Sequence, residues 1–220
     1  MSVVRRVGVI VLPMVFGPSD SFYAHVDDLE DQGYAVLRVD DYGVTEALKL
    51  IPLLVSGHRR NLLVNSIDEQ AVIQVVVEAA AYLRDKDKCT TVIALGFGFG
   101  GIIALKAAAA ANVDGTIAWY PHLVVDAEVT KEPANLAGLT RPTLVFYGAA
   151  DKVTPGSIPI AQAVARQSEP LRVEVFPGAG HAFADRHVWR GMRSPLYDKT
   201  AAAASWTAAL RWIHNLAAAA

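Results

Sequence analysis

Thr91-Val-Ile-Ala-Leu-Gly-Phe-Gly-Phe-Gly-Gly-Ile-Ile-Ala-Leu105 is the stretch of sequence that decides the fold. Its first five residues form a continuous apolar run of strand length, and the run 100–111 has the composition of a helix. Four glycines stand between and within these runs, at positions 96, 98, 100 and 101. Glycine density of this kind predicts a sharp bend, so we expect a buried strand that turns abruptly into a helix.

Short apolar runs and helical stretches alternate along the rest of the chain. Strands are predicted at 7–13, 34–39, 91–95, 116–120, 142–147 and 171–176, and helices at 19–31, 68–84, 100–111, 158–166 and 198–216. This alternation predicts an α/β fold with a mostly parallel, doubly wound sheet. Strands that are apolar throughout also predict helices on both faces of that sheet. We expect one domain, residues 1–220, without internal repeats.

Composition and charge narrow the classes of function. The 220 residues are 53% hydrophobic and carry a net charge of −2 without a basic block, which argues against nucleic acid as a partner. No apolar run reaches the length of a membrane span, and the start has no signal-peptide pattern. The single cysteine, Cys89, precedes a strand and is expected to be a buried small hydrophobe in a reducing, cytoplasmic setting. The sequence leaves the oligomeric state open.

The bend at residues 96–100 has the frame of a nucleophile elbow, written Gly-x-Ser-x-Gly, in which the central residue attacks a carbonyl. In this chain the frame is Gly96-Phe97-Gly98-Phe99-Gly100, so the central residue is a glycine without a side chain. A covalent acyl-enzyme cannot form there.

Two later strand ends carry acid–base residues. Asp151 follows the predicted strand 142–147, and His181 follows the predicted strand 171–176 within Gly178-Ala-Gly-His-Ala-Phe183. The chain order of elbow, aspartate and histidine is that of α/β-hydrolases. Because carboxyl ends of parallel strands meet at one sheet edge, we expect Asp151 and His181 to converge beside Gly98. There the aspartate would orient the imidazole and stabilise its protonated form.

The chain resembles the dienelactone hydrolases, a compact branch of the α/β-hydrolase fold, over nearly its whole length. The resemblance rests on the elbow, on the two segments just described and on two N-terminal segments, 11–17 and 28–36. It implies a Cys or Ser nucleophile at position 98, a His base at His181 and an Asp orienter at Asp151. It also implies an oxyanion hole formed by the amides of Phe99 and Val15.

Two further positions depart from the family pattern. Met14 stands where the family often has an acidic residue beside the nucleophilic thiol, and Asp185 stands where its enzymes for anionic lactones have a substrate-binding Arg. A laboratory knock-out would change one position and not three. We therefore favour natural divergence over an engineered Gly98.

A site of this kind still holds a general base and backbone donors. Positioned proton transfer contributes about 10²–10⁴-fold and a backbone oxyanion donor about 2.7–4 kcal/mol. We expect a cofactor-free and metal-free enzyme with a small-molecule substrate, a carbonyl or lactone compound. The enzyme would catalyse hydrolysis by activated water, or else a cyclisation, isomerisation or lyase reaction. The expected lining residues lie at or after the ends of predicted strands or in the segment 40–65, and they are Met14, Phe16, Phe97, Tyr120, His122, Arg59, Arg60 and Phe183.

Two other interpretations remain open. A hydrolase fold without its nucleophile can serve as a non-catalytic binding protein, although binding alone gives no reason to retain both Asp151 and His181. The spacing Gly96-x-Gly98-x-x-Gly101 also fits a dinucleotide-binding fingerprint. That fingerprint usually opens its domain and needs an acid at the end of the next strand, whereas here the residue is Tyr120.

Overall fold

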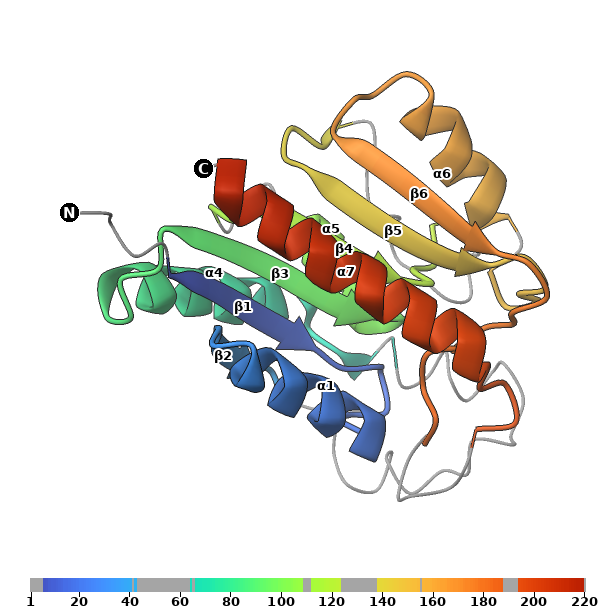
Figure 1. Cartoon of the computed structure of the whole chain (residues 1–220), viewed down its shortest axis with the longest axis horizontal. Coiled ribbons are helices and arrows are strands. Elements are labelled where there is room, and N and C mark those ends of the chain that lie inside the picture. Colours follow the sequence, from blue (N-terminus) through green and yellow to red (C-terminus); the bar gives the residue numbers. More distant parts are fainter. Residues whose placement is uncertain are drawn as a thin grey trace.

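The computed structural model describes residues 6–40, 42, 64, 66–108, 112–123, 138–154, 156–187 and 194–219. Its centre is a six-stranded sheet in the order β2-β1-β3-β4-β5-β6, in which every neighbouring pair is parallel (Figure 1). The strands are β1 (Val7–Leu12), β2 (Ala35–Arg38), β3 (Thr91–Phe97), β4 (Gly115–Trp119), β5 (Thr143–Gly148) and β6 (Leu171–Phe176). The predicted α/β class, the parallel sheet and all six predicted strands are therefore confirmed.

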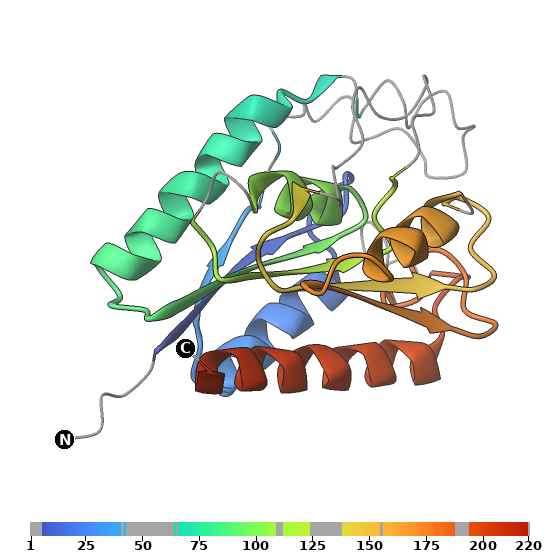
Figure 2. The same cartoon turned by 90° about the horizontal axis from the view of Figure 1, so that it is seen from above.

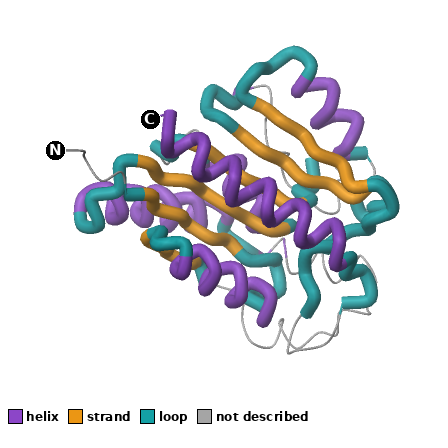
Figure 3. The backbone as a smooth tube through the Cα atoms, viewed as in Figure 1, coloured by secondary structure: helices purple, strands orange, loops and turns teal. Residues whose placement is uncertain are grey.

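Helices cover both faces of the sheet, as continuous burial of the central strands requires. They are α1 (Asp20–Asp31), α4 (Glu69–Asp85), α5 (Phe99–Ala107), α6 (Ser157–Ala165) and α7 (Lys199–Ala219). Figure 2 shows α1 and α7 on one face and α4 and α5 on the other. Figure 3 shows the same alternation of strand, loop and helix along the chain. Among the helices of the described part, none is long and apolar enough to cross a membrane.

Local sequence explains where two of the helices begin. The Ser19 side chain accepts a hydrogen bond from the Phe22 amide at 3.2 Å, and Asp68 accepts from the amides of Gln70 and Ala71 at 3.1 Å. Both satisfy amides that the first helical turn leaves without a partner. The helix predicted at 19–31 thus begins directly after its cap, Ser19.

The core lies in two layers, one under each set of helices. Side chains of α1 and α7 pack with β3, β4 and β5 on one face, and those of α4 and α5 pack with β1 and β3 on the other. Cys89 belongs to the second layer and is buried, as expected, at the amino-terminal end of β3. Burial raises the pKa of its thiol, so this cysteine is poorly suited to act as a nucleophile.

Candidate active site

The turn between β3 and α5 brings Gly98 to the carboxyl edge of the sheet. Gly98 is the residue before the first turn of α5, and its φ of 53° and ψ of −114° lie outside the regions that other residues readily adopt. Its amide donates to the Trp119 carbonyl at 2.9 Å, which fastens the turn to the end of β4. The predicted sharp bend is therefore present and is fixed by the neighbouring strand.

The three glycines of this frame have different surroundings. A Cβ on Gly96 would overlap the carbonyl oxygen of Gly100, and a Cβ on Gly100 would overlap that of Pro13. Apart from the residues next to it in the chain, a Cβ on Gly98 would lie within 4 Å of only one described residue, Met14. The Cγ and Cε atoms of Met14 would be 3.8 Å away. Packing thus requires the outer glycines, whereas position 98 has room for a side chain.

Asp151 and His181 come together across the ends of β5 and β6. The His181 Nδ1 lies 2.9 Å from the Asp151 Oδ2, and the Asp151 side chain is fully buried while that of His181 is 17% exposed. Asp151 also accepts from the amides of Val153 and Thr154 at 2.7 and 2.9 Å and from the Thr154 hydroxyl. The carboxylate is thereby held in one orientation facing the imidazole.

These hydrogen bonds decide the charge of Asp151. Burial by itself would raise the pKa of this carboxyl, but the hydrogen bonds from His181 and Thr154 and the nearby imidazole lower it to about 2. An ionised carboxylate only accepts, so the proton of a neutral His181 lies on Nδ1. The Nε2 atom then carries a lone pair, which is the arrangement that a general base needs.

The chain after β6 crosses the sheet edge back to the start of α1. A Cβ on Gly148 would overlap the Ala179 carbonyl, which shows how closely this segment passes over the end of β5. Further along, the Asp185 carboxyl meets the Ser19 hydroxyl at 3.5 Å, and the His187 amide donates to the Ser21 hydroxyl at 3.1 Å. Residues 177–187 therefore bring His181 over the edge that also carries Gly98.

Tyr120 connects the two parts of the site. It follows Trp119, the acceptor for the Gly98 amide, and its ring centroid lies 5.1 Å from that of His181. Its backbone has a φ of 40°, and its buried hydroxyl donates to the Asp185 carboxyl. Tyr120 is thus a neighbour of both the bend and the imidazole.

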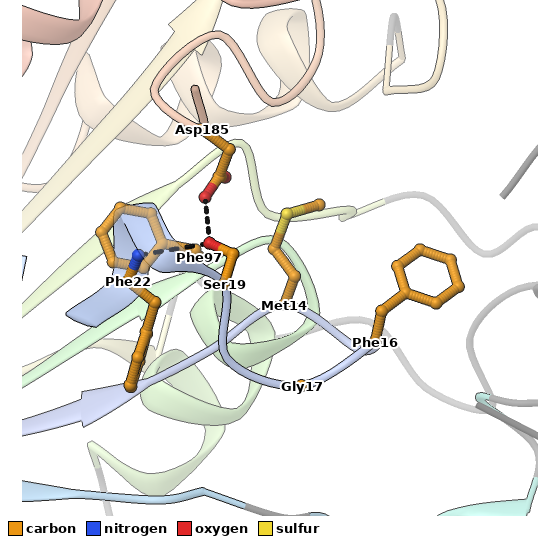
Figure 4. A pocket seen from close by; sticks show the side chains of 7 residues that line it. All are labelled: Met14, Phe16, Gly17, Ser19, Phe22, Phe97 and Asp185. Atoms are coloured by element: carbon orange, nitrogen blue, oxygen red, sulfur yellow. Dashed lines mark hydrogen bonds between the residues drawn. The ribbon is translucent and has the colours of Figure 1, made fainter. Parts of the chain in front are cut away.

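A small hollow, partly open to solvent and with room for about one water-sized group, lies beside the bend (Figure 4). Its wall is mostly apolar and includes one carboxyl: Met14, Phe16, Gly17, Ser19, Phe22, Phe97 and Asp185. In Figure 4 the Asp185 carboxyl points toward the Ser19 hydroxyl, with the Met14 side chain beside them. Because Met14 is also the neighbour of the space at position 98, the hollow adjoins the bend.

The other predicted lining residues lie in different places. Phe183 is fully buried, packs against Tyr120 and Phe176, and is not in the wall of the hollow. His122 is half-buried just past the end of β4. Arg59 and Arg60 lie outside the described residues. Within the described part of the chain, no group of three His, Cys, Asp or Glu side chains is arranged to hold a metal ion.

The two predicted oxyanion donors both lie at this edge. Phe99 is the first residue of α5, and Val15 lies in the turn that follows β1. No hydrogen bond joins the amide of either residue to another described residue. The Phe99 amide, at the start of a helix, can receive negative charge on an oxygen.

Asp185 is the lining residue that the sequence did not reveal as functional. It was noted only as a departure from the arginine of related enzymes, and its contacts with Ser19 and Tyr120 join parts of the chain 166 and 65 residues apart. Its position four residues after His181 was the available signal.

Comparisons with known proteins agree with this architecture. The model of the dienelactone hydrolase family matches residues 2–217. A Saccharolobus solfataricus protein named "Putative carboxymethylenebutenolidase" is 25% identical over 142 residues, which are 63% of this chain and 49% of that protein. The chain thus spans about half the length of this relative.

Solved structures show the same fold at low identity. A structure from Klebsiella pneumoniae called "Putative Dienelactone Hydrolase" has a TM-score of 0.80 at 22% identity, covering 97% of this chain and 89% of that one. A dienelactone hydrolase-like promiscuous phosphotriesterase from metagenomic libraries has a TM-score of 0.69 at 23% identity, covering 96% and 87%.

Proposed function

Because the chain belongs to the dienelactone hydrolase family, we propose that it is an enzyme of this family that works without a covalent nucleophile. In this proposal Gly98 occupies the nucleophile position, His181 is the general acid and base, and Asp151 orients it. The substrate is a small carbonyl or lactone compound, in keeping with the butenolide in the name of the Saccharolobus solfataricus relative. No cofactor takes part.

The observation that carries this proposal is the hydrogen bond between His181 Nδ1 and Asp151 Oδ2 at the sheet edge that also holds Gly98. A pair that served only to stabilise the fold would have no need for a partly exposed imidazole. Here the imidazole side chain is 17% exposed, and its Nε2 has no protein partner among the described residues.

The reaction follows from these positions. Nε2 of His181 would take a proton either from a carbon next to the carbonyl or from a water molecule directed at it. The carbonyl oxygen would gain negative charge and be held by the amides of Phe99 and Val15. Asp151 would stabilise the imidazolium that forms, and His181 would then return the proton to the product.

Two reactions test the proposal without knowledge of the natural substrate: hydrolysis of γ-butyrolactone and hydrogen–deuterium exchange of cyclopentanone, both followed by NMR. We expect His181→Ala to lower the faster of the two rates by about 100-fold, the lower part of the range for positioned proton transfer. His214→Ala removes an exposed histidine from α7 and should leave both rates unchanged.

The vacant position at Gly98 is the observation that favours a second function, a non-catalytic binding protein. That function predicts that wild type and His181→Ala give the same rates as buffer in both reactions. Such a result, with both proteins folded by circular dichroism, would contradict the enzymatic proposal.

A further inference from the structure

Asp185 is the one charged side chain among the residues that line the hollow beside Gly98. Asp185 is 3% exposed, and it forms no ion pair with another described residue. A buried charge without a counter-ion is costly, and natural proteins usually pair it. Asp185 therefore stands out from the apolar wall around it.

The hydrogen bonds of Asp185 satisfy only part of its capacity. Its Oδ2 accepts from the Tyr120 hydroxyl, and its Oδ1 meets the Ser19 hydroxyl at 3.5 Å, the outer limit of a hydrogen bond. An ionised carboxylate offers about four acceptor positions. By contrast, Asp151 accepts four hydrogen bonds from its surroundings. Oδ1 of Asp185 is therefore free to accept another donor.

We propose that the hollow receives a positively charged nitrogen of the substrate and that Asp185 is its counter-ion. This inference rests on the proposed function, because it assigns a substrate class to the same site. A cation near a poorly solvated carboxylate gains more Coulomb energy than it would in water. The ring of Phe16 in the wall adds a weaker attraction for cations.

The surrounding charges oppose an anionic ligand. An anion in the hollow would face the Asp185 carboxylate, and the Asp151 carboxylate lies at the same sheet edge. The exposed side chain of Arg186 follows Asp185 in sequence but does not line the hollow. The site therefore distinguishes ligands by charge.

The protonation of Asp185 should control binding. Burial raises the pKa of Asp185 to about 6, against the lowering effects of the Tyr120 hydroxyl, His181 and Ser19. Tyr120 and His181 are the titratable groups that face it, and burial keeps the pKa of Tyr120 well above its usual value. At neutral pH the carboxyl is mostly ionised, so a cation should bind more tightly at pH 7.5 than at pH 5.

Three probes of one shape test the proposal: benzylamine, benzyl alcohol and benzoate, with affinities measured by isothermal titration calorimetry at pH 7.5. We expect benzylamine to bind at least about tenfold more tightly than the alcohol, and benzoate to bind most weakly. Asp185→Asn should remove the preference for benzylamine and leave the alcohol unchanged. Asp20→Asn, which removes an exposed carboxyl one residue from Ser19, is the matched control and should bind all three as wild type does.

Equal affinities for the three probes in wild type, no binding of any probe, or an unchanged preference in folded Asp185→Asn would each overturn the proposal. The wild-type comparison needs no variant, so a misfolded Asp185→Asn leaves the test intact. Binding is measured without turnover. A catalytically inert site would therefore refute the proposed function alone, and a site without charge preference would refute this inference alone.

Discussion

The β3–α5 turn and the loops after β5 and β6 reach the same sheet edge, but they supply different things. The turn supplies backbone: a left-handed residue at Gly98 and the amide of Phe99. The loops supply side chains, since Asp151 is held by four hydrogen bonds and one of them joins it to His181. In the proposed function, the site thus keeps the backbone framework and the acid–base pair of a hydrolase without an attacking side chain at position 98.

The comparison also separates the two reasons for glycine within the turn. Gly96 and Gly100 are required by contact, because a methyl group would overlap carbonyl oxygens. Gly98 has space around it, and only its φ of 53° disfavours a larger residue. A serine or cysteine at position 98 would thus be accommodated at a modest conformational cost.

The largest expected effect is on the free energy of unfolding, and it comes from the packing difference between Gly100 and Gly98. Gly100→Ala should lower the free energy of unfolding by at least about 3 kcal/mol, because its methyl group has no room against the carbonyls of Pro13 and Leu12. Gly98→Ala should cost about 1–3 kcal/mol, because a φ of 53° with a ψ of −114° is a sparsely populated backbone conformation for a residue with a Cβ. Urea denaturation of both variants measures the difference, and equal losses would show that the turn is not packed as described.

The next largest effect is on the pH dependence of stability, and it comes from Asp151 in the loop after β5. The folded-state pKa of Asp151, about 2, lies below the ordinary value of 3.8 for an aspartate, so its stabilising contribution is present above pH 3.8 and is lost as the pH falls through 2. Wild type should therefore lose about 2 kcal/mol more than Asp151→Asn between pH 5 and pH 2. Parallel pH profiles of unfolding for the two proteins would contradict the tight carboxylate–imidazole pair.

The smallest expected effect is also on the pH dependence of stability. It comes from Asp185, whose pKa is shifted in the direction opposite to that of Asp151. The pKa of Asp185 is raised from 3.8 to about 6, so the folded state holds its proton more tightly and stability falls as the pH rises from 4 to 6. Asp185→Asn should abolish that fall and stabilise the protein by at most about 2 kcal/mol at pH 7.5, because the raised pKa already includes the hydrogen bond from Tyr120. At pH 4 the two proteins should unfold alike. A destabilised variant at pH 7.5 would show that the buried charge is fully compensated.

The sequence predicted the fold well because the relevant signals are local. Each strand is a short apolar run, and helix starts carry capping side chains such as Ser19 and Asp68. The predicted boundaries differ from the observed ones by a few residues. The helix predicted at 100–111, for example, is observed at Phe99–Ala107.

The site was only partly predictable. Chain order placed Asp151 and His181 at one edge, because parallel strands end on the same side of a sheet. That topology places the two residues on one side of the sheet, and the path of the two loops sets their 2.9 Å contact. The contacts of Asp185 with Ser19 and Tyr120 depend on how residues 177–187 cross the sheet edge, and no local pattern encodes that path. The path of this segment also places the ring of Phe183 in the core, although the sequence predicted that Phe183 lines the pocket.

Introducing a nucleophile at position 98 tests most directly whether base, oxyanion donors and bend are aligned. Gly98→Ser should hydrolyse p-nitrophenyl acetate at least about 100-fold faster than Gly98→Ala, and adding His181→Ala should abolish the gain. Gly98→Ala carries the same backbone strain without the hydroxyl, so it isolates the chemistry from the fold. A folded Gly98→Ser that is no faster than Gly98→Ala would contradict the account.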